Sequence, residues 1–238
     1  MSQKISLESL VTSPAIRPGW PEILSGIAAF AIVGFGGGAL IVQSKLDPMV
    51  VGLMLSALSG IACLAGFAVA ALIRIRSWSA FGVRPVPFRW LAIGVGAGLI
   101  AFIIKGFAIM AYIALTGQDA NPQDIYATGA SGGMVTVILS TLFIGILTPI
   151  GEEFLFRGVV ANALLRYGPF IGVVGSSIIF ALLHGINMIF PAAIVAGLVT
   201  AEVFRRSGSV WPAVIVHVVF NLPTIPVMIL ASAAGWAP

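Results

Sequence analysis

The stretch from Gly151 to Gly158 reads GEEFLFRG and lies between two long apolar runs. It places two adjacent carboxylates, Glu152 and Glu153, and the guanidinium of Arg157 within six residues. A charged side chain costs at least about 2.5 to 3.5 kcal/mol at the centre of a membrane helix. If the flanking runs lie in lipid, these three groups need partners, water or a chemical function.

The composition places the flanking runs in a membrane. Of the 238 residues, 59% are hydrophobic and 8% are charged, and the mean hydropathy is +1.11. A soluble domain usually has about 25% charged residues. We therefore expect an all-α protein, a polytopic transmembrane helical bundle. Most of the twelve Lys and Arg residues are scattered at the ends of apolar runs, which is typical of topology signals, so we expect no nucleic-acid partner.

About eight helices are expected, because seven runs are long enough, or nearly so, to cross a bilayer core of about 30 Å. Residues Glu152 to Tyr167 are also helix-like but polar on one side, and we predict a motif helix there that either re-enters the membrane or packs against the others. Residues 1–21 are expected to form an N-terminal cytoplasmic segment, with no cleavable signal peptide. Residues 22–238 are expected to form one transmembrane domain with its functional core at about 129–222. The seven runs are Pro21–Val42, Pro48–Ile73, Trp90–Leu115, Gly129–Ile150, Phe170–Ile189, Pro191–Phe204 and Val210–Trp236.

Basic residues predict the orientation of the chain. Lys4 and Arg17 precede the first run, and four arginines lie in residues 74–89, whereas residues 116–128 contain acids and no base. Lysine and arginine prefer the cytoplasmic side of a membrane. We therefore expect a multi-pass protein of the plasma membrane with the N-terminus in the cytoplasm, the C-terminus outside, and Glu152 in the cytoplasmic half.

The spacing within the motif helix predicts different roles for its two acids. Glu153 and Arg157 stand four apart with the acid first, which favours an ion pair on one face of a helix. Glu152 points about 100° away from Glu153. We expect Arg157 to neutralise Glu153 and Glu152 to stay free for a partner elsewhere. The alternative is an ion pair at a helix start, capped by Gly151, with no chemical role.

Two histidines, His184 and His217, lie in apolar runs that are expected to be helical. His217 and Asn221 stand four apart, so the imidazole and the carboxamide share one helix face. A single histidine in such a run is more often an interhelical hydrogen-bond residue. Taken together with the two acids and the arginine, the histidines predict three helices that converge on one wet cavity.

Two kinds of hydrolysis fit such a cavity. In the first, Glu152 and His184 polarise a water molecule for attack on a peptide carbonyl. The developing oxyanion is then stabilised by His217 and Asn221. In the second, Glu152, His184 and His217 bind a divalent metal such as zinc, which lowers the pKa of the water. The spacing does not choose between them, and no cofactor is required by the first.

Three ordered motifs within about residues 129–222 resemble a known family. They are Glu152-Glu153-x-x-x-Arg157, Phe180-x-x-x-His184 and His217-x-x-x-Asn221. In this order, in an all-helical membrane chain, they resemble the CAAX protease and bacteriocin-processing family. That family is also called the Abi family and includes the type II CAAX prenyl endopeptidases.

The resemblance implies an eight-helix intramembrane endopeptidase whose cavity opens to the cytosol. It implies that Glu152 activates water with His184, while His217 and Asn221 assist as an oxyanion site. Members are described as glutamate-dependent and as metal-dependent, so both mechanisms stay open. Substrates in the family range from prenylated C-terminal tripeptides to peptide leaders and membrane-protein segments. The expected partners are therefore the lipid bilayer and a membrane-associated peptide or protein, prenylated in part of the family.

Two other functions stay open. A non-catalytic membrane scaffold or immunity-type protein of the same fold would use the polar groups only to hold helices together. A proton-coupled transporter would use Glu152 and Glu153 as carriers, although no repeat or matched pair of broken spans supports it.

Two further features concern architecture. Gly52, Ser56 and Gly60 stand four apart in the second run and predict close helix packing. Lys105, near the middle of the third run, is expected to line the cavity, to reach the membrane interface, or to pair with an acid such as Glu202.

Overall fold

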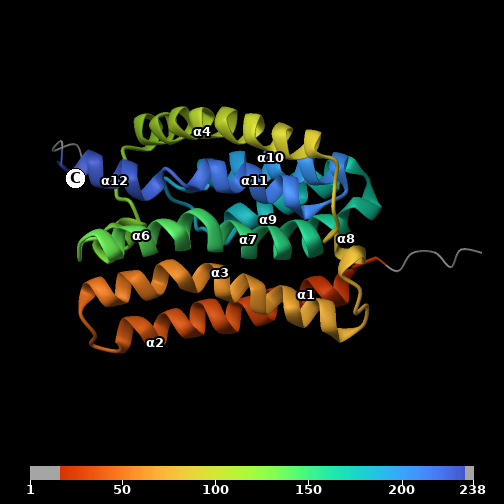
Figure 1. Cartoon of the computed structure of the whole chain (residues 1–238), viewed down its shortest axis with the longest axis horizontal. Helices are drawn as coiled ribbons and strands as arrows, with labels where there is room; N and C mark the ends of the chain where they lie inside the picture. Colours follow the sequence, from red (N-terminus) through yellow and green to blue (C-terminus); the bar gives the residue numbers. More distant parts are fainter. Residues whose placement is uncertain (1–16, 234–238) are drawn as a thin grey trace, which may run out of the picture.

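The structure is a computed structural model that describes residues 17–233. Residues 1–16 of the expected cytoplasmic segment, and the end of the last run at Trp236, lie outside the described residues. The described part is entirely helical, with its long helices running roughly parallel or antiparallel to one another (Figure 1). The all-α class predicted from the sequence is therefore confirmed.

Five helices of the described part are long and apolar enough to cross a membrane, which supports a multi-pass membrane protein. The first is Trp20–Gln43, in which the π-helical turn η2 (Ile32–Gly36) joins α1 (Trp20–Ala31) to α2 (Gly37–Gln43). The others are α3 (Pro48–Ile73), α4 (Phe88–Thr116), Met134–Tyr167 and Val210–Leu230.

Two of the seven predicted runs form shorter or more polar helices. The run Phe170–Ile189 becomes η7 (Ile171–Gly175) followed by α9 (Ser176–Leu182). The run Pro191–Phe204 becomes α10 (Phe190–Ser207), which carries three charged residues in its last two turns. Short segments complete the fold. They are η3 (Trp78–Phe81), α5 (Asp124–Gly129) and α12 (Thr224–Ala233), the last of which follows α11 (Val210–Asn221).

The predicted motif helix is present, but it is continuous with the run before it. Residues 134–167 form a single helix of 34 residues. Gly151 therefore lies inside a helix and caps no helix start. Pro149 cannot donate a backbone hydrogen bond, and the wider π-helical turn directly before it adapts the helix to that loss. The segments of this helix are α6 (Met134–Leu142), η4 (Phe143–Leu147), α7 (Thr148–Glu153), η5 (Phe154–Ala161), α8 (Asn162–Leu164) and η6 (Leu165–Tyr167).

Helix α3 lies between the first helix and helix 134–167 (Figure 1). Its small residues allow the close packing that the spacing predicts. A Cβ atom added to Gly60 would lie 2.8 Å from the carbonyl oxygen of Leu147, and one added to Gly151 would overlap the carbonyl oxygen of Gly60. The backbones of α3 and α7 therefore touch directly beside Glu152.

On the other side of helix 134–167, α11 packs against α4 and α10 (Figure 1). Two glycines of α4 permit this approach. A Cβ atom added to Gly94 would lie 2.8 Å from the carbonyl oxygen of Pro212, and one added to Gly98 would lie 2.7 Å from the carbonyl oxygen of Val216. Helix 134–167 is thereby enclosed between α3 and α11. This arrangement places the motif residues at the centre of the bundle.

Candidate active site

Glu152 and Glu153 end α7, and Arg157 lies in the π-helical segment η5 that follows. All three side chains are buried, and each residue is at most 4% exposed. Wide π-helical turns are rare and are frequently found at functional sites. The motif therefore combines buried charge with an unusual local backbone, in the middle of a helix.

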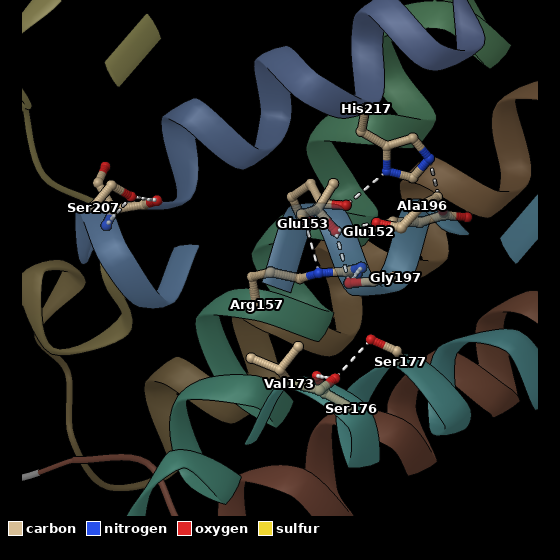
Figure 2. A network of polar contacts seen from close by, with 12 residues as sticks. Glu152, Glu153, Arg157, Val173, Ser176, Ser177, Ala196, Gly197, Ser207 and His217 are labelled. Atoms are coloured by element: carbon tan, nitrogen blue, oxygen red, sulfur yellow. Dashed lines mark hydrogen bonds and ion pairs between the residues drawn. The ribbon is translucent and has the colours of Figure 1, made fainter. Parts of the chain in front are cut away.

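Glu153 is held between two partners from different helices (Figure 2). Its Oε2 lies 3.1 Å from Nε of Arg157, and its Oε1 lies 2.7 Å from Nδ1 of His217. Arg157 also donates from Nη2 to the Gly197 carbonyl oxygen at 3.2 Å, and its guanidinium carbon lies 4.8 Å from the centre of the Phe180 ring. The ion pair expected from the i, i+4 spacing is present, and the bond to His217 adds a link to α11.

Glu152 is placed differently from its neighbour. Its Oε1 accepts a hydrogen bond from Oγ of Ser59 at 3.0 Å, and its Oε2 lies 3.7 Å from Nε2 of His217. The imidazole of His217 therefore stands between the two carboxylates, with Nδ1 bonded to Glu153 and Nε2 directed toward Glu152. The 3.7 Å separation is longer than a hydrogen bond.

His184 lies in the turn that follows α9, where the sequence predicts a continuing helix. The helix ends at Leu182, and Gly185 adopts a left-handed backbone conformation with φ of 79°. The ring of His184 stays close to α9, because its Nδ1 is 2.9 Å from the Phe180 carbonyl oxygen. Asn187 holds the turn by donating to the His184 carbonyl oxygen at 2.8 Å.

One cavity of about 800 Å³ brings the candidate residues together. Glu152, His184, His217 and Asn221 all line it, whereas Glu153 and Arg157 lie behind its wall. Asn221 is oriented by a hydrogen bond from Nδ2 to the Ile144 carbonyl oxygen at 3.3 Å. Side chains from several other parts of the chain complete the wall. They include Phe30, Leu58, Ser59, Phe102, Lys105, Tyr126 and Phe180.

The candidate residues that line the cavity fall in a segment that matches a known family. Residues 134–223 match the family model described as type II CAAX prenyl endopeptidase Rce1-like. The resemblance found in the sequence is thereby confirmed over this segment. The match spans helix 134–167, α9, the turn after α9, α10 and α11, and it includes Glu152, His184, His217 and Asn221. Searches of curated proteins and of solved structures found no match.

A metal site does not assemble from the predicted ligands. Among residues 17–233, no group of three His, Cys, Asp or Glu side chains is placed to bind one metal ion. The carboxylate of Glu153 is already engaged by Arg157 and His217. Nδ1 of His184 is turned to a backbone carbonyl, so Nε2 is the one ring nitrogen of His184 left to bind a metal. The residues present thus do not fit the set of Glu152, His184 and His217 as metal ligands.

The sequence reasoning did not single out Ser59, which bonds to Glu152. The position of Ser59, one residue before Gly60 on the small-residue face of α3, could have indicated that its hydroxyl lies near the motif helix. Lys105 lines the cavity, as one of its three expected roles requires, and forms no contact with Glu202. The partners of Glu202 are Arg205 and Arg206 at the end of α10.

Proposed function

We propose that the protein is an intramembrane endopeptidase that cleaves a membrane-associated peptide or protein with a water molecule activated by Glu152. The observation that carries this proposal is the cavity in which Glu152, His184, His217 and Asn221 meet. In the described part of the chain, Glu152 is the one carboxylate on the cavity wall, so it is the available general base. The family match supports a protease.

The contacts of the histidines suggest how the water is held. Nδ1 of His184 donates to a backbone carbonyl, so its Nε2 is left to accept a hydrogen bond from water. Oε2 of Glu152 accepts the second water proton. As the water oxygen attacks the peptide carbonyl carbon, Glu152 takes this proton, and it later transfers the proton to the leaving amine.

His217 and Asn221 are assigned to the oxyanion. This role requires a proton on each ring nitrogen of His217, whose imidazole lies between the carboxylates of Glu152 and Glu153. His217 then donates from Nδ1 to Glu153 and offers Nε2–H to the oxyanion, with the amide of Asn221 beside it. In this assignment Glu153 and Arg157 act through His217, as positioning residues.

The cavity wall suggests how a substrate arrives. Apolar residues of the first helix and of α4, such as Phe30, Phe35 and Phe102, line the same cavity as Glu152. A lipid-borne or prenylated substrate would thus meet apolar surface on its way to the carboxylate. We propose a site in the cytoplasmic half of the plasma membrane, with the N-terminus inside, the C-terminus outside, and a catalytic core at about residues 129–222.

The test uses the purified chain in vesicles with a farnesylated peptide that ends in a free carboxyl group. Hydrolysis, followed by mass spectrometry, is expected to fall about 100-fold or more in Glu152→Gln, with an unchanged yield of folded protein. Glu202→Gln is the matched control, since it removes a carboxylate outside the cavity. If Glu153→Gln abolishes hydrolysis while Glu152→Gln does not, the two acids have the opposite roles.

Other outcomes would favour the alternatives. Loss of hydrolysis on treatment with a chelator would favour a metal-dependent mechanism. If the wild type hydrolyses no peptide and Glu152→Gln fails to fold, the polar groups belong to a scaffold or immunity-type protein. Solute flux across sealed vesicles would favour a transporter.

A further inference from the structure

Thr148 brings a hydroxyl to the wall of the cavity, one helical turn before Glu152. Every fourth residue of helix 134–167 from Ile144 to Phe156 lines the cavity, so these residues form one face of the helix. Thr148 is 6% exposed. Its hydroxyl and the carboxylate of Glu152 therefore stand on the same side of the helix, with their Cβ atoms about 5 to 6 Å apart.

The hydroxyl of Thr148 lacks a partner in the protein. Among the described residues, its buried Oγ1 atom forms no hydrogen bond. A threonine inside a helix commonly bonds to the carbonyl four residues before it, as Thr200 does with Ala196 at 2.8 Å. The corresponding carbonyl oxygen for Thr148 is that of Ile144, which accepts from Nδ2 of Asn221 at 3.3 Å instead. Because a buried hydroxyl without a partner is costly, a molecule in the cavity is expected to bond to it.

A water molecule fits between Thr148 and Glu152. Two hydrogen bonds of about 2.8 Å span about 5.6 Å, which matches the separation of side chains four apart on a helix. Oε1 of Glu152 accepts from Ser59, so Oε2 is left to face this water. The cavity of about 800 Å³ has the room, and a buried water needs about two to four polar partners. Thr148, Glu152 and Nε2 of His184 supply three such groups on the cavity wall.

We propose that Oγ1 of Thr148 holds the water molecule that Glu152 activates. This inference rests on the proposed function and adds to it a residue that orients the nucleophile. The two water protons are directed to Oε2 of Glu152 and Nε2 of His184, and one lone pair of the water accepts from the hydroxyl of Thr148. The second lone pair is then aimed at the peptide carbonyl carbon.

The proton of the Thr148 hydroxyl is not transferred in this step. A lone pair of the water forms the new carbon–oxygen bond, and the π pair of the carbonyl becomes the oxyanion. The water proton that faces Glu152 moves to its carboxylate. Because the hydroxyl contacts the water and no part of the peptide, its removal slows the chemical step and leaves substrate binding unchanged.

The experiment compares three variants in vesicles, with the same farnesylated peptide as the Glu152→Gln test. Thr148→Val keeps the shape of the side chain and removes the hydroxyl, so kcat is expected to fall about 10-fold or more while KM is unchanged. Thr148→Ser keeps the hydroxyl and should restore most of the rate. Thr141→Val is the matched control, because it removes from the same helix another buried hydroxyl that has no partner among the described residues and lies away from the cavity wall.

The unfolding temperature separates a chemical effect from a structural one. Neither Thr148→Val nor Thr141→Val breaks a hydrogen bond within the described part of the protein. Both variants are therefore expected to unfold at the wild-type temperature or slightly above it. Earlier unfolding of Thr148→Val would show that the hydroxyl is a structural group, and this would overturn the inference.

Three kinetic results would also overturn it. An unchanged kcat in Thr148→Val would mean that the hydroxyl does not hold the reacting water. A higher KM at constant kcat would mean that Thr148 binds the peptide instead. An equal loss of rate in Thr141→Val would mean that any hydroxyl of this helix has the same effect.

Infrared spectroscopy separates this inference from the proposed function, because it requires no turnover. The spectrum of the wild type minus that of Glu152→Gln isolates the carboxyl band of Glu152. Thr148→Val is expected to shift this band, since the water at Oε2 loses a partner, and Thr141→Val to leave it in place. If this holds while the wild type hydrolyses nothing, the water site stands and the protease proposal fails. An unshifted band in Thr148→Val contradicts the water site.

Discussion

Two clusters of acid and arginine occupy opposite environments in this protein. Glu153 and Arg157 stand four apart in the middle of helix 134–167, where their side chains are at most 1% exposed. Glu202 pairs with Arg205 and Arg206, three and four residues later, at the end of α10. There the side chain of Glu202 is 34% exposed and that of Arg206 is 63% exposed.

The comparison teaches that equal spacing along a helix does not imply equal burial or equal partners. At the end of α10 the charges are partly exposed and bond mainly to one another, so either partner can be replaced by water. In the bundle centre, Glu153 and Arg157 also bond to His217 and Gly197 on other helices. Removal of one member there leaves an unpaired charge away from water.

The largest effect is expected from Arg157→Ala. This change leaves the buried carboxylate of Glu153 without its cation and should destabilise the fold by about 3 to 5 kcal/mol. The readout is the temperature at which the purified protein unfolds in detergent. Arg206→Ala is the matched control, and an equally large loss in that variant would erase the contrast between the two clusters.

A double replacement tests whether the central pair serves stability or position. Glu153→Leu with Arg157→Leu removes both charges and should recover all but about 1 kcal/mol of the Arg157→Ala loss. Hydrolysis should nevertheless stay lost, because Nδ1 of His217 has no acceptor. Full activity in a stable double variant would show that the proposed positioning role is incorrect.

A much smaller effect is expected from Arg205→Ala. Glu202 keeps Arg206 at close range in this variant, and isolated exposed ion pairs contribute little. The unfolding temperature and the rate of hydrolysis should match those of the wild type within error. A clear loss of either would mean that the end of α10 contributes to the site.

The smallest effect concerns pH. Hydrogen bonds from Arg205, and then from Arg206, lower the pKa of Glu202 from its ordinary 4.5 to about 2 in the folded protein. Because folding lowers the pKa of Glu202, its carboxylate contributes fully to the stability of the fold above pH 4.5. This contribution is lost as the pH falls from 4.5 toward 2. The difference in unfolding temperature between wild type and Glu202→Gln should therefore be constant near pH 6 and shrink below pH 4. A difference that grows on acidification would contradict this pairing.

Local patterns in the sequence predict much of the fold. The apolar runs give the helical class, and the spacing of Gly52, Ser56 and Gly60 predicts the close approach of α3. Helix limits are less predictable. Gly151 suggests a boundary by its low helix propensity, yet packing against Gly60 keeps it inside a helix. Conversely, an apolar run continues past Leu182 although Gly185 ends the helix there.

The contacts of the candidate site also differ in how well the sequence predicts them, because some join residues close in the sequence and others join residues far apart. The ion pair of Glu153 with Arg157 depends on i, i+4 spacing and can be predicted from the sequence. The bond between Glu153 and His217 joins residues 64 apart, and no local pattern specifies it. The contact of Lys105 with the Phe220 carbonyl, across 115 residues, depends equally on how the helices pack.

The length of helix 134–167 has a consequence for the surrounding lipid. At an α-helical rise, 34 residues extend about 50 Å, against a hydrocarbon layer of about 30 Å. Such a helix must tilt or protrude. Glu152 is near its midpoint, so the depth of the carboxylate below the headgroups changes with the tilt. Bilayers of different acyl-chain length should therefore alter how readily solvent reaches this carboxylate, without any change in the protein sequence.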